Sequence, residues 1–176
     1  LTSWNGLMIS ALAQGYQVLG DVRYRDAAER AAKFILSDMR KDGKLLRTHR
    51  KGESRLLAYL DDYAFTEIAL VDLYEATFDE QWLNAADDLA RGMIDQFWDK
   101  ENGAFFSTTD DHTNLITRTK PTYDGAEPSG NSMAVIALQR LAKLRDNAEY
   151  RDKALHVLKA NHENLGSSPR AYMKML

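Results

Sequence analysis

A structural unit that recurs three times is the feature of this 176-residue chain that most constrains its fold. The first copy spans residues 11–28 and carries an Ala-Leu pair, a tyrosine, an aspartate, a second aromatic residue and an Ala-Ala pair. The same order returns 58 residues later over residues 69–86, and a thinner copy returns 68 residues after that, from Ala137 to Ala154. A repeat of this period predicts an array of similar units, because each unit stacks on the next to bury its apolar face.

Each unit has the spacing of two helices. Apolar residues three and four positions apart predict the first helix, and a capping residue, Asp21 in the first unit, precedes the second. The predicted pairs are 3–19 with 22–39, 62–77 with 79–98, and 129–145 with 147–165. A short turn inside each pair makes its two helices antiparallel neighbours. We therefore expect the first helices of all three units to begin at one common end.

Turn and strand patterns separate the helix pairs. Residues 42–48 resemble residues 102–108, shifted by 60, and each segment has an Asp-Gly or Asn-Gly turn followed by a short strand. Residues 55–59 and 115–119 are the predicted returning strands. We expect two small β-hairpins at the end where the first helices begin. Loops at one end of a rigid scaffold are a common place for a binding site.

Composition and charge exclude several classes of protein. The net charge is −3 with acidic and basic residues interspersed, so we expect no nucleic-acid partner. The sequence has no apolar run of about 18 residues, so we expect no transmembrane helix. It has no cysteine, which rules out disulfides and Cys-ligated zinc in this stretch. No signal peptide is visible, and we expect a cytoplasmic location.

The repeat brings three short polar segments into equivalent positions at the predicted helix starts. They are Trp4-Asn5-Gly6, Asp62-Tyr63-Ala64 and Gly130-Asn131-Ser132. The equivalence of Asn5, Tyr63 and Asn131 favours a shared inward direction, from which all three could position a ligand. Trp4 can stack on a sugar ring or seal the core. These segments together are one candidate binding site.

Four acidic residues are candidates for acid–base chemistry. Asp61 and Asp62 open the second unit, where an aspartate is also one of the best helix N-caps. One cap needs one aspartate, so capping leaves the other unexplained. Asp124 and Glu127 lie just before the third unit. Paired carboxylates of this kind carry out glycoside chemistry, whereas the alternative is an elaborate turn.

Three basic or aromatic side chains are further candidates for ligand binding. Arg118 and Lys120 precede the third unit, and His49 lies in the first predicted hairpin between Arg47 and Arg50. These groups can bind a carboxylate or phosphate, or they can form a solvated strand face. No histidine lies three or four residues from another, so the sequence predicts no helical metal pair, and we expect no cofactor.

Four segments together resemble one family. They are LTSWNGLM at 1–8, LDDYAF at 60–65, DLYEATFD at 72–79 and DGAEPSGNS at 124–132. This combination resembles the helical region of the thioredoxin-domain-containing family, also called the DUF255 or spermatogenesis-associated protein 20-like family, from residue 1 to about residue 165. The combination is specific, although each segment alone is not.

The resemblance implies an N-terminal thioredoxin-like domain followed by an (α/α) toroid similar to six-hairpin glycosidases and N-acylglucosamine 2-epimerases. The present chain lacks the thioredoxin-like part, and its three helix pairs are about half of such a toroid. We therefore expect an all-α fold, an incomplete toroid of about three helical hairpins with short β-hairpins between pairs. One domain would contain units at about 3–57, 58–125 and 126–176. We expect a fragment that continues past residues 168–171, which resemble the start of another helix.

Two functions from different classes remain open. The first is a toroid that binds or processes a sugar or polyol by carboxylate acid–base chemistry, like a glycoside hydrolase or a sugar epimerase. The second is a non-catalytic scaffold or substrate-recognition domain that accompanies a thioredoxin-like redox domain, since a fold alone does not establish an activity. Half a toroid would leave the side faces of its terminal pairs uncovered, so we also expect self-association.

Overall fold

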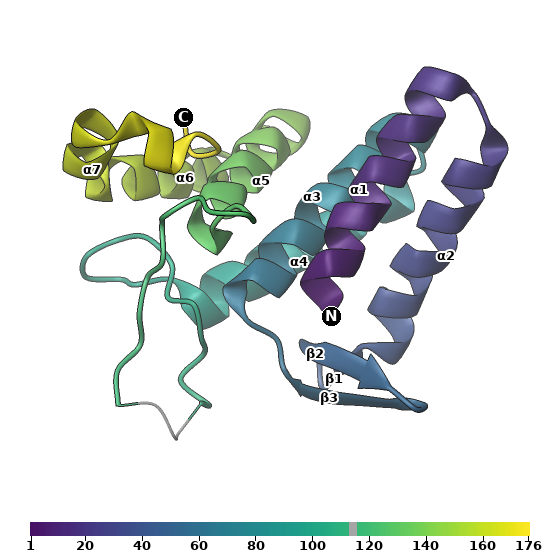
Figure 1. Ribbon diagram of the computed structural model, residues 1–176, viewed down its shortest axis with the longest axis horizontal. Helices are drawn as coiled ribbons and strands as arrows, with labels where there is room; N and C mark the ends of the chain where they lie inside the picture. The colour runs from purple at the N-terminus through teal and green to yellow at the C-terminus, as the bar shows by residue number, and fades with distance from the viewer. Residues whose placement is uncertain (113–115) are drawn as a thin grey trace.

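The structure is a computed structural model that describes residues 1–112 and 116–176. Helical pairs dominate this described part (Figure 1). The pairs are α1 (Thr2–Leu19) with α2 (Val22–Asp38), α3 (Leu60–Thr77) with α4 (Glu80–Phe97), and α5 (Gly130–Arg145) with α6 (Ala148–Ala160). A short α7 (His162–Ser167) and a 3-10 helix, η1 (Pro169–Tyr172), follow. The predicted all-α fold, an incomplete toroid of helical hairpins, is confirmed.

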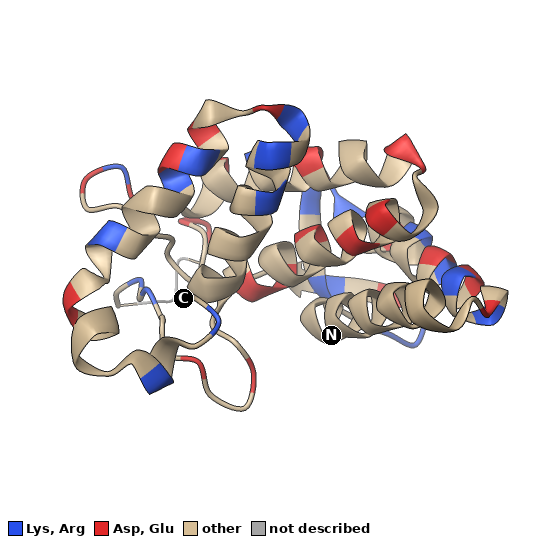
Figure 2. Cartoon of the chain, turned by 90° about the horizontal axis from the view of Figure 1, so that it is seen from above, with Lys and Arg blue, Asp and Glu red and all other residues tan. Residues whose placement is uncertain are grey.

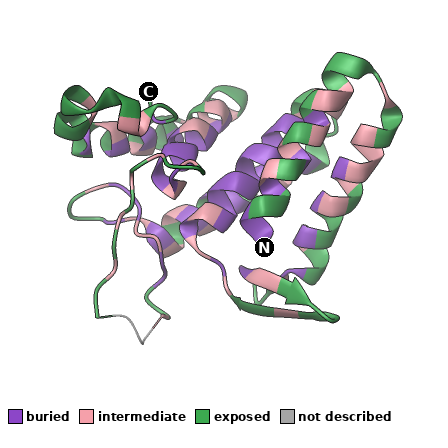
Figure 3. Cartoon of the chain, in the orientation of Figure 1, coloured by how far each residue is buried: buried purple, intermediate pink, exposed green. Residues whose placement is uncertain are grey.

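The first helices of the units form an inner row in which α3 lies between α1 and α5. Figure 1 shows α1 and α3 side by side, with α2 at the outer edge. Because it has neighbours on all sides, α3 is buried from Asp62 to Leu73, as the purple ribbon in Figure 3 shows. None of the described helices is long and apolar enough to cross a membrane.

The prediction for the last helix is wrong in one respect, because the structure has two helices in this range. α6 ends at Ala160 and α7 begins at His162, where the sequence predicts one helix over 147–165. The side-chain amide of Asn161, which is buried, donates to the carbonyl of Val157 at 2.8 Å. This bond satisfies a carbonyl at the end of α6 and stops the helix there. The expected further helix after residue 168 is the short η1, with Pro169 at its start.

The first predicted hairpin is confirmed as an antiparallel sheet. It contains β1 (Arg40–Lys41), β2 (Lys44–Arg50) and β3 (Glu53–Leu57), with Leu46 opposite Leu57. The turn between β1 and β2 needs positive φ at Asp42 and Gly43, with values of 52° and 79°, which glycine adopts without strain. Figure 1 places this sheet beside the N-terminal end of α1.

The second predicted hairpin is not formed as strands in the described residues. The predicted returning strand began at Leu115, which lies outside them, and residues 116–119 are irregular. One bridge joins Trp98 and Phe105, and the Ser107 N–H donates to the Thr119 carbonyl at 2.8 Å. The Arg118 side chain binds the Thr108 carbonyl with Nε at 2.8 Å. A side chain therefore satisfies a carbonyl that a strand ladder would otherwise pair.

Residues at equivalent repeat positions fasten the segments before the second and third helix pairs. The Tyr63 hydroxyl accepts a hydrogen bond from the Leu45 N–H at 2.9 Å. Sixty-eight residues later, Asn131 accepts from the Phe105 N–H at 2.8 Å and donates to the Phe105 carbonyl at 2.9 Å. Asn131 also donates to the Pro121 carbonyl at 2.9 Å. The repeat is thus structural at this position, because each side chain holds the extended segment that precedes it.

A prediction follows for Asn131, which shares its repeat position with Asn5 and Tyr63. Asn131→Ala is expected to lower the free energy of unfolding by about 2 kcal/mol, because it leaves the buried N–H and carbonyl of Phe105 without partners. Asn5→Ala is the matched control at the equivalent position. Its amide is exposed and donates only to the Leu1 carbonyl in the described structure, so the loss should be below about 0.5 kcal/mol. Urea denaturation of both variants measures the difference, and equal losses would contradict the prediction.

A second set of equivalent positions ties the inner helices together near their middle. Gln14 of α1, Asp72 of α3 and Arg140 of α5 share one repeat register. Asp72 accepts from Gln14 at 3.4 Å and pairs with Arg140 at 2.6 Å. Ser10 also donates to Asp72, and Arg140 pairs with Glu75 at 2.9 Å. Burial raises the pKa of Asp72, while Arg140 and Gln14 oppose the rise.

Candidate functional site

The start of α3 forms the candidate site. Asp62 is fully buried there, and its carboxylate accepts from the backbone N–H of Ser3 and of Tyr59, both at 2.9 Å. Arg47 of β2 adds a third donor at 2.8 Å. Tyr59 is the N-cap, so Asp62 is the third residue of the helix and not the N-cap that the sequence offered as an alternative. Its carboxylate completes a capping box.

Burial and the hydrogen-bond donors of Asp62 shift the pKa of its carboxyl in opposite directions. Burial raises the pKa of this carboxyl, and the adjacent charge of Asp61 adds to the rise. The backbone N–H groups of Tyr59 and Ser3 and the guanidinium of Arg47 oppose it. Because every donor comes from a different segment, Asp62 joins α1, the β-sheet and α3 at one point.

Asp61 faces a cavity. Its side chain is 29% exposed, and its carboxylate lies 3.3 Å from Nη1 of Arg47, the same atom that contacts Asp62. The cavity has a volume of about 230 Å³. Its lining residues are Tyr59, Leu60, Asp61, Ser107, Pro121, Pro128 and Gly130. The Arg47 guanidinium also lies over the Tyr59 ring, 4.2 Å from its centre, and this stacking fixes one wall.

A contact between the first and third units adjoins this region. The indole N–H of Trp4 donates to the carboxylate of Glu127 at 2.8 Å, and both side chains are exposed. Glu127 directly precedes Pro128 of the cavity, and Trp4 directly follows Ser3, which binds Asp62. We call Trp4, Asp61, Asp62 and Glu127 the rim cluster. Three of the four acidic candidates and the candidate tryptophan therefore lie on segments that line or adjoin this cavity.

The fourth acid, Asp124, has a different environment. Its two carboxylate oxygens accept from the backbone N–H groups of Ser129, at 2.9 Å, and of Lys174, at 2.8 Å. These bonds tie the segment before α5 to the C-terminal segment. The geometry favours the turn that the sequence offered as the alternative for this residue.

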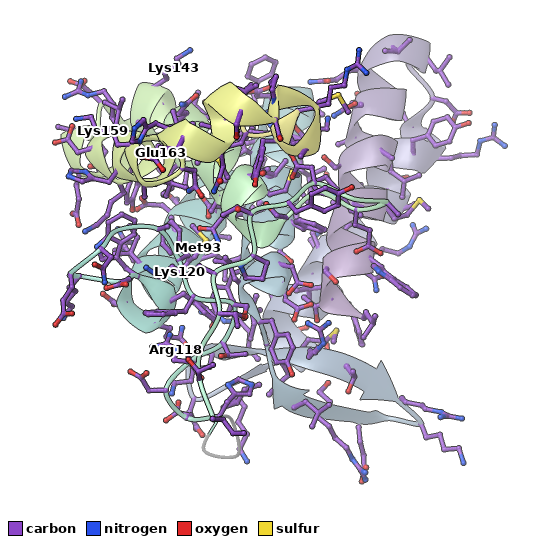
Figure 4. The ribbon with its side chains drawn as sticks, turned by 60° about the vertical axis from the view of Figure 1, so that its left-hand side comes forward. Met93, Arg118, Lys120, Lys143, Lys159 and Glu163 are labelled. Atoms are coloured by element: carbon purple, nitrogen blue, oxygen red, sulfur yellow. The ribbon has the colours of Figure 1, made fainter. Side chains whose placement is uncertain are left out.

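The remaining sequence candidates bind parts of the protein itself. Tyr63 and Asn131 are buried and hold backbone segments, as described above. Lys120 donates to the Gly103 carbonyl at 2.9 Å, and His49 bonds the Ser54 hydroxyl at 2.9 Å. Figure 4 labels Arg118 and Lys120 in the long segment between α4 and α5. Across the described residues, no hydrogen bond or ion pair of Arg118, Lys120 or His49 involves the rim cluster.

Sequence reasoning missed several parts of the site. Tyr59 and Pro121 of the cavity wall come from segments that carried no motif, so only tertiary structure joins them to Pro128 of the segment at 124–132. Outside the site, the buried Glu67 was also missed, although a lone acid inside the apolar run of α3 is a visible signal. Within residues 1–112 and 116–176, no group of three or more His, Cys, Asp or Glu is placed to hold a metal ion.

Comparison with known proteins shows the sequence relatives of this chain. Spermatogenesis-associated protein 20 of Rattus norvegicus is 35% identical over the whole chain, which covers 24% of that protein. An uncharacterized protein of Caenorhabditis elegans is 34% identical over 99% of the chain, which covers 25% of it. The chain spans about a quarter of the length of these curated relatives. The resemblance to the spermatogenesis-associated protein 20-like family is confirmed.

Solved structures share the fold at low sequence identity. One is an alpha-1,6-mannanase of Salegentibacter, as an inactive variant with two consecutive aspartates replaced, in complex with alpha-1,6-mannotriose. It is 16% identical with a TM-score of 0.73, over 91% of this chain and 46% of that one. A cellobiose 2-epimerase from Bacillus thermoamylovorans is 15% identical with a TM-score of 0.73, over 92% of this chain and 44% of that one. These likenesses show the toroid fold alone.

A family model accounts for nearly the whole chain. The model of glycosyl hydrolase family 76 matches residues 2–164, which include the inner helix row and every member of the rim cluster. The matched range ends within α7, after all three helical pairs. By this match, the chain belongs to glycosyl hydrolase family 76.

Proposed function

We propose that the rim cluster binds a carbohydrate, and that its carboxylates carry acid–base chemistry on that sugar in the whole protein. The observation that carries this proposal is the consecutive pair Asp61-Asp62 at the start of α3, with Asp61 facing the cavity and Asp62 held rigidly behind it. Family membership and the glycosidase and epimerase structures with the same fold support it.

The sequence contains three pairs of adjacent aspartates, and these pairs differ in their surroundings in the structure. They lie at 61–62, 87–88 and 110–111. Asp87 and Asp88 pair with Arg91 within α4, whereas Asp110 and Asp111 pair with Arg118 and Lys44. The pair at 61–62 contributes a residue to the cavity wall. The Salegentibacter mannanase is inactive when two consecutive aspartates are changed, which directs attention to such a pair.

The different burial of the acidic residues gives them different proposed roles. Both oxygens of Asp62 are occupied by donors, so this residue positions the helix start and Arg47. Asp61 is partly exposed and lines the cavity, whereas Glu127 is exposed and directly precedes Pro128 of the cavity wall. Glycoside chemistry needs two carboxylates, one to protonate the leaving oxygen and one to assist water or attack the sugar. Asp61 and Glu127 are the proposed reacting pair, with Trp4 holding Glu127 and presenting an aromatic face to a sugar ring.

A second function has its own supporting observation. Arg47 contacts both Asp61 and Asp62, so one cation neutralises part of the proposed reacting pair. A carboxylate that a cation neutralises in this way suits the binding of a sugar without a chemical reaction. The alternative is therefore a carbohydrate-recognition or scaffold domain within a longer protein.

Titration calorimetry of the 176-residue chain with alpha-1,6-mannotriose and a panel of neutral disaccharides tests the proposal. We expect binding to at least one sugar and loss of that binding in Asp61→Asn. Asp88→Asn is the matched control, since it changes the exposed acid of another consecutive pair, and it should bind normally. Binding without hydrolysis or epimerisation by the full-length protein would favour the recognition function. Absence of binding to every sugar, with the chain folded, would refute both sugar-binding functions and favour the scaffold.

A further inference from the structure

The three-stranded sheet carries a concentration of positive charge. Residues 40–55 contain seven of the 23 Lys and Arg residues and only two acidic residues, whereas the whole chain has a net charge of −3. In Figure 2 the sheet lies behind the helices and its visible strands are largely blue, while red and blue both occur on the helices. A surface on which one sign of charge gathers attracts ligands of the opposite sign.

Comparison within the repeat shows that the fold does not require this charge. By the shift of 60 residues, Arg50 and Lys51 at the tip of the β2–β3 hairpin are equivalent to Asp110 and Asp111. Both segments begin with a turn whose glycine has positive φ, 79° in the first and 70° in the second. Because the same kind of segment has bases in one copy and acids in the other, packing of the repeat does not explain the basic tip.

The two cations at this tip have no acidic partner in the described structure. Three other cations of the sheet each pair with an acidic side chain, namely Lys44, Arg47 and Arg55. Arg50 and Lys51 are exposed and make no ion pair within residues 1–112 and 116–176. The sheet does attract acidic groups, since Lys44 holds Asp111 at 2.5 Å. The charge of Arg50 and Lys51 therefore remains open to an anion from outside the chain.

These two cations line a groove. Its volume is about 460 Å³, and its lining residues are Thr48, Arg50, Lys51, Glu53 and Arg55. Arg55 pairs with Glu53 within β3, which leaves Arg50 and Lys51 as the charges that no acid neutralises. A guanidinium donates two parallel N–H groups to a sulfate, phosphate or carboxylate, and an ammonium adds a point charge. The groove thus has the donors that one acidic group of a ligand needs.

The strand β2 connects this groove with the rim cluster. Arg47 of β2 contacts Asp61 of the cavity wall at 3.3 Å, and Arg50 follows three residues later on the same strand. A strand rises about 3.3 Å per residue, so the Cα atoms of Arg47 and Arg50 lie about 10 Å apart. An oligosaccharide of a few rings is long enough to span this separation.

We propose that the groove of the β2–β3 hairpin binds an acidic group of a carbohydrate, so that the ligand of the rim cluster is an anionic glycan carrying sulfate, phosphate or carboxylate groups. This inference rests on the proposed function of the cavity and adds the charge of its ligand. Neutral rings of the sugar chain lie at the rim cluster, whose carboxylates repel acidic groups. The acidic group lies at Arg50 and Lys51, where the charge is complementary.

Titration calorimetry with alpha-1,6-mannotriose and with the same sugar after chemical sulfation tests the groove. We expect the sulfated sugar to bind at least about tenfold more tightly, with a gain that shrinks as the salt concentration rises. Arg50→Asp/Lys51→Asp gives the tip the acids of the second unit and should abolish this gain. Aspartate tolerates the positive φ of Lys51, which is 53°, so circular dichroism should show an unchanged fold. Binding of the neutral sugar should be the same in this variant and the parent.

A matched control makes the same change of charge elsewhere. Lys143→Glu/Lys159→Glu alters two exposed lysines of α5 and α6, labelled in Figure 4, and should keep the gain from sulfate. An equal loss in this control, or equal affinity of the parent for both sugars, would overturn the proposal. Loss of neutral-sugar binding in Asp61→Asn tests the proposed function separately, because that ligand carries no acidic group.

Competition distinguishes a glycan from other anions. Inorganic sulfate, a short poly-glutamate peptide and a short DNA oligonucleotide are added to the complex with the sulfated sugar. We expect each to displace the sugar only at concentrations at least about tenfold above that of unlabelled sulfated sugar. Displacement at equal concentration by any of the three would overturn the assignment of the groove to a carbohydrate.

Discussion

Gly6→Ala is expected to lower the free energy of unfolding by about 3 kcal/mol, whereas Gly15→Ala on the same helix should raise it by about 0.5–1 kcal/mol. A Cβ on Gly6 would lie 2.8 Å from the carbonyl carbon of Phe65 and 2.9 Å from its oxygen. Both are backbone atoms of α3, which cannot rotate away, so the two helices must separate. A Cβ on Gly15 would meet only the Tyr24 ring, at 3.7 Å, which is an ordinary contact.

Urea denaturation at one low protein concentration measures both variants, so that association does not contribute. Gly15→Ala controls for helix propensity, since both positions lie within α1. The opposite signs are the essential result. If Gly6→Ala were neutral or stabilising, the close contact between α1 and α3 at this position would be incorrect.

Glu67→Gln is expected to stabilise the protein at neutral pH and to leave it nearly unchanged at acidic pH. Glu67 of α3 is fully buried, and neither of its carboxylate oxygens has a hydrogen-bond partner among the described residues. Burial raises the pKa of Glu67 well above its usual value, and the nearby carboxylate of Asp87 adds to the rise. The protonated acid is therefore the form that the folded protein favours.

The sign of the pH dependence follows from proton linkage. Above the usual pKa of 4.5, the unfolded chain loses the Glu67 proton while the folded chain keeps it. The free energy of unfolding then falls as the pH rises, until the folded-state pKa is passed. The stability gap between Glu67→Gln and the parent should grow by about 1.4 kcal/mol per pH unit over this window.

Thermal and urea unfolding between acidic and mildly alkaline pH measures the gap. Glu101→Gln is the control, because Glu101 is exposed and its removal should leave the slope unchanged. Asp62 and Asp72 also have raised pKa values and contribute to the slope of the parent, so the difference between variant and parent is the quantity to read. A constant gap across the pH range would show that Glu67 is paired or hydrated in solution.

The sequence by itself determined the helical pairs and their order. Apolar spacing and capping residues are local signals, and Asp21 caps α2 as expected, with its side chain accepting from the Arg23 N–H at 3.0 Å. The repeat predicted that the first helices of the three units begin at one common end, and the structure packs α3 between α1 and α5. It also identified equivalent positions, although Tyr63 and Asn131 proved to bind backbone segments of the protein.

Only the tertiary structure decided which candidates form a site. Asp61 lines the cavity beside Pro128, and Trp4 contacts Glu127, although these residues are far apart in the chain; both arrangements depend on close packing of α1 and α5 against α3. The same packing made Asp62 a buried residue with three donors, while Asp124 accepts from backbone N–H groups and Lys120 donates to the Gly103 carbonyl. Local spacing specifies helices because their hydrogen bonds are local, whereas the surroundings of a carboxylate depend on which distant segments supply its donors.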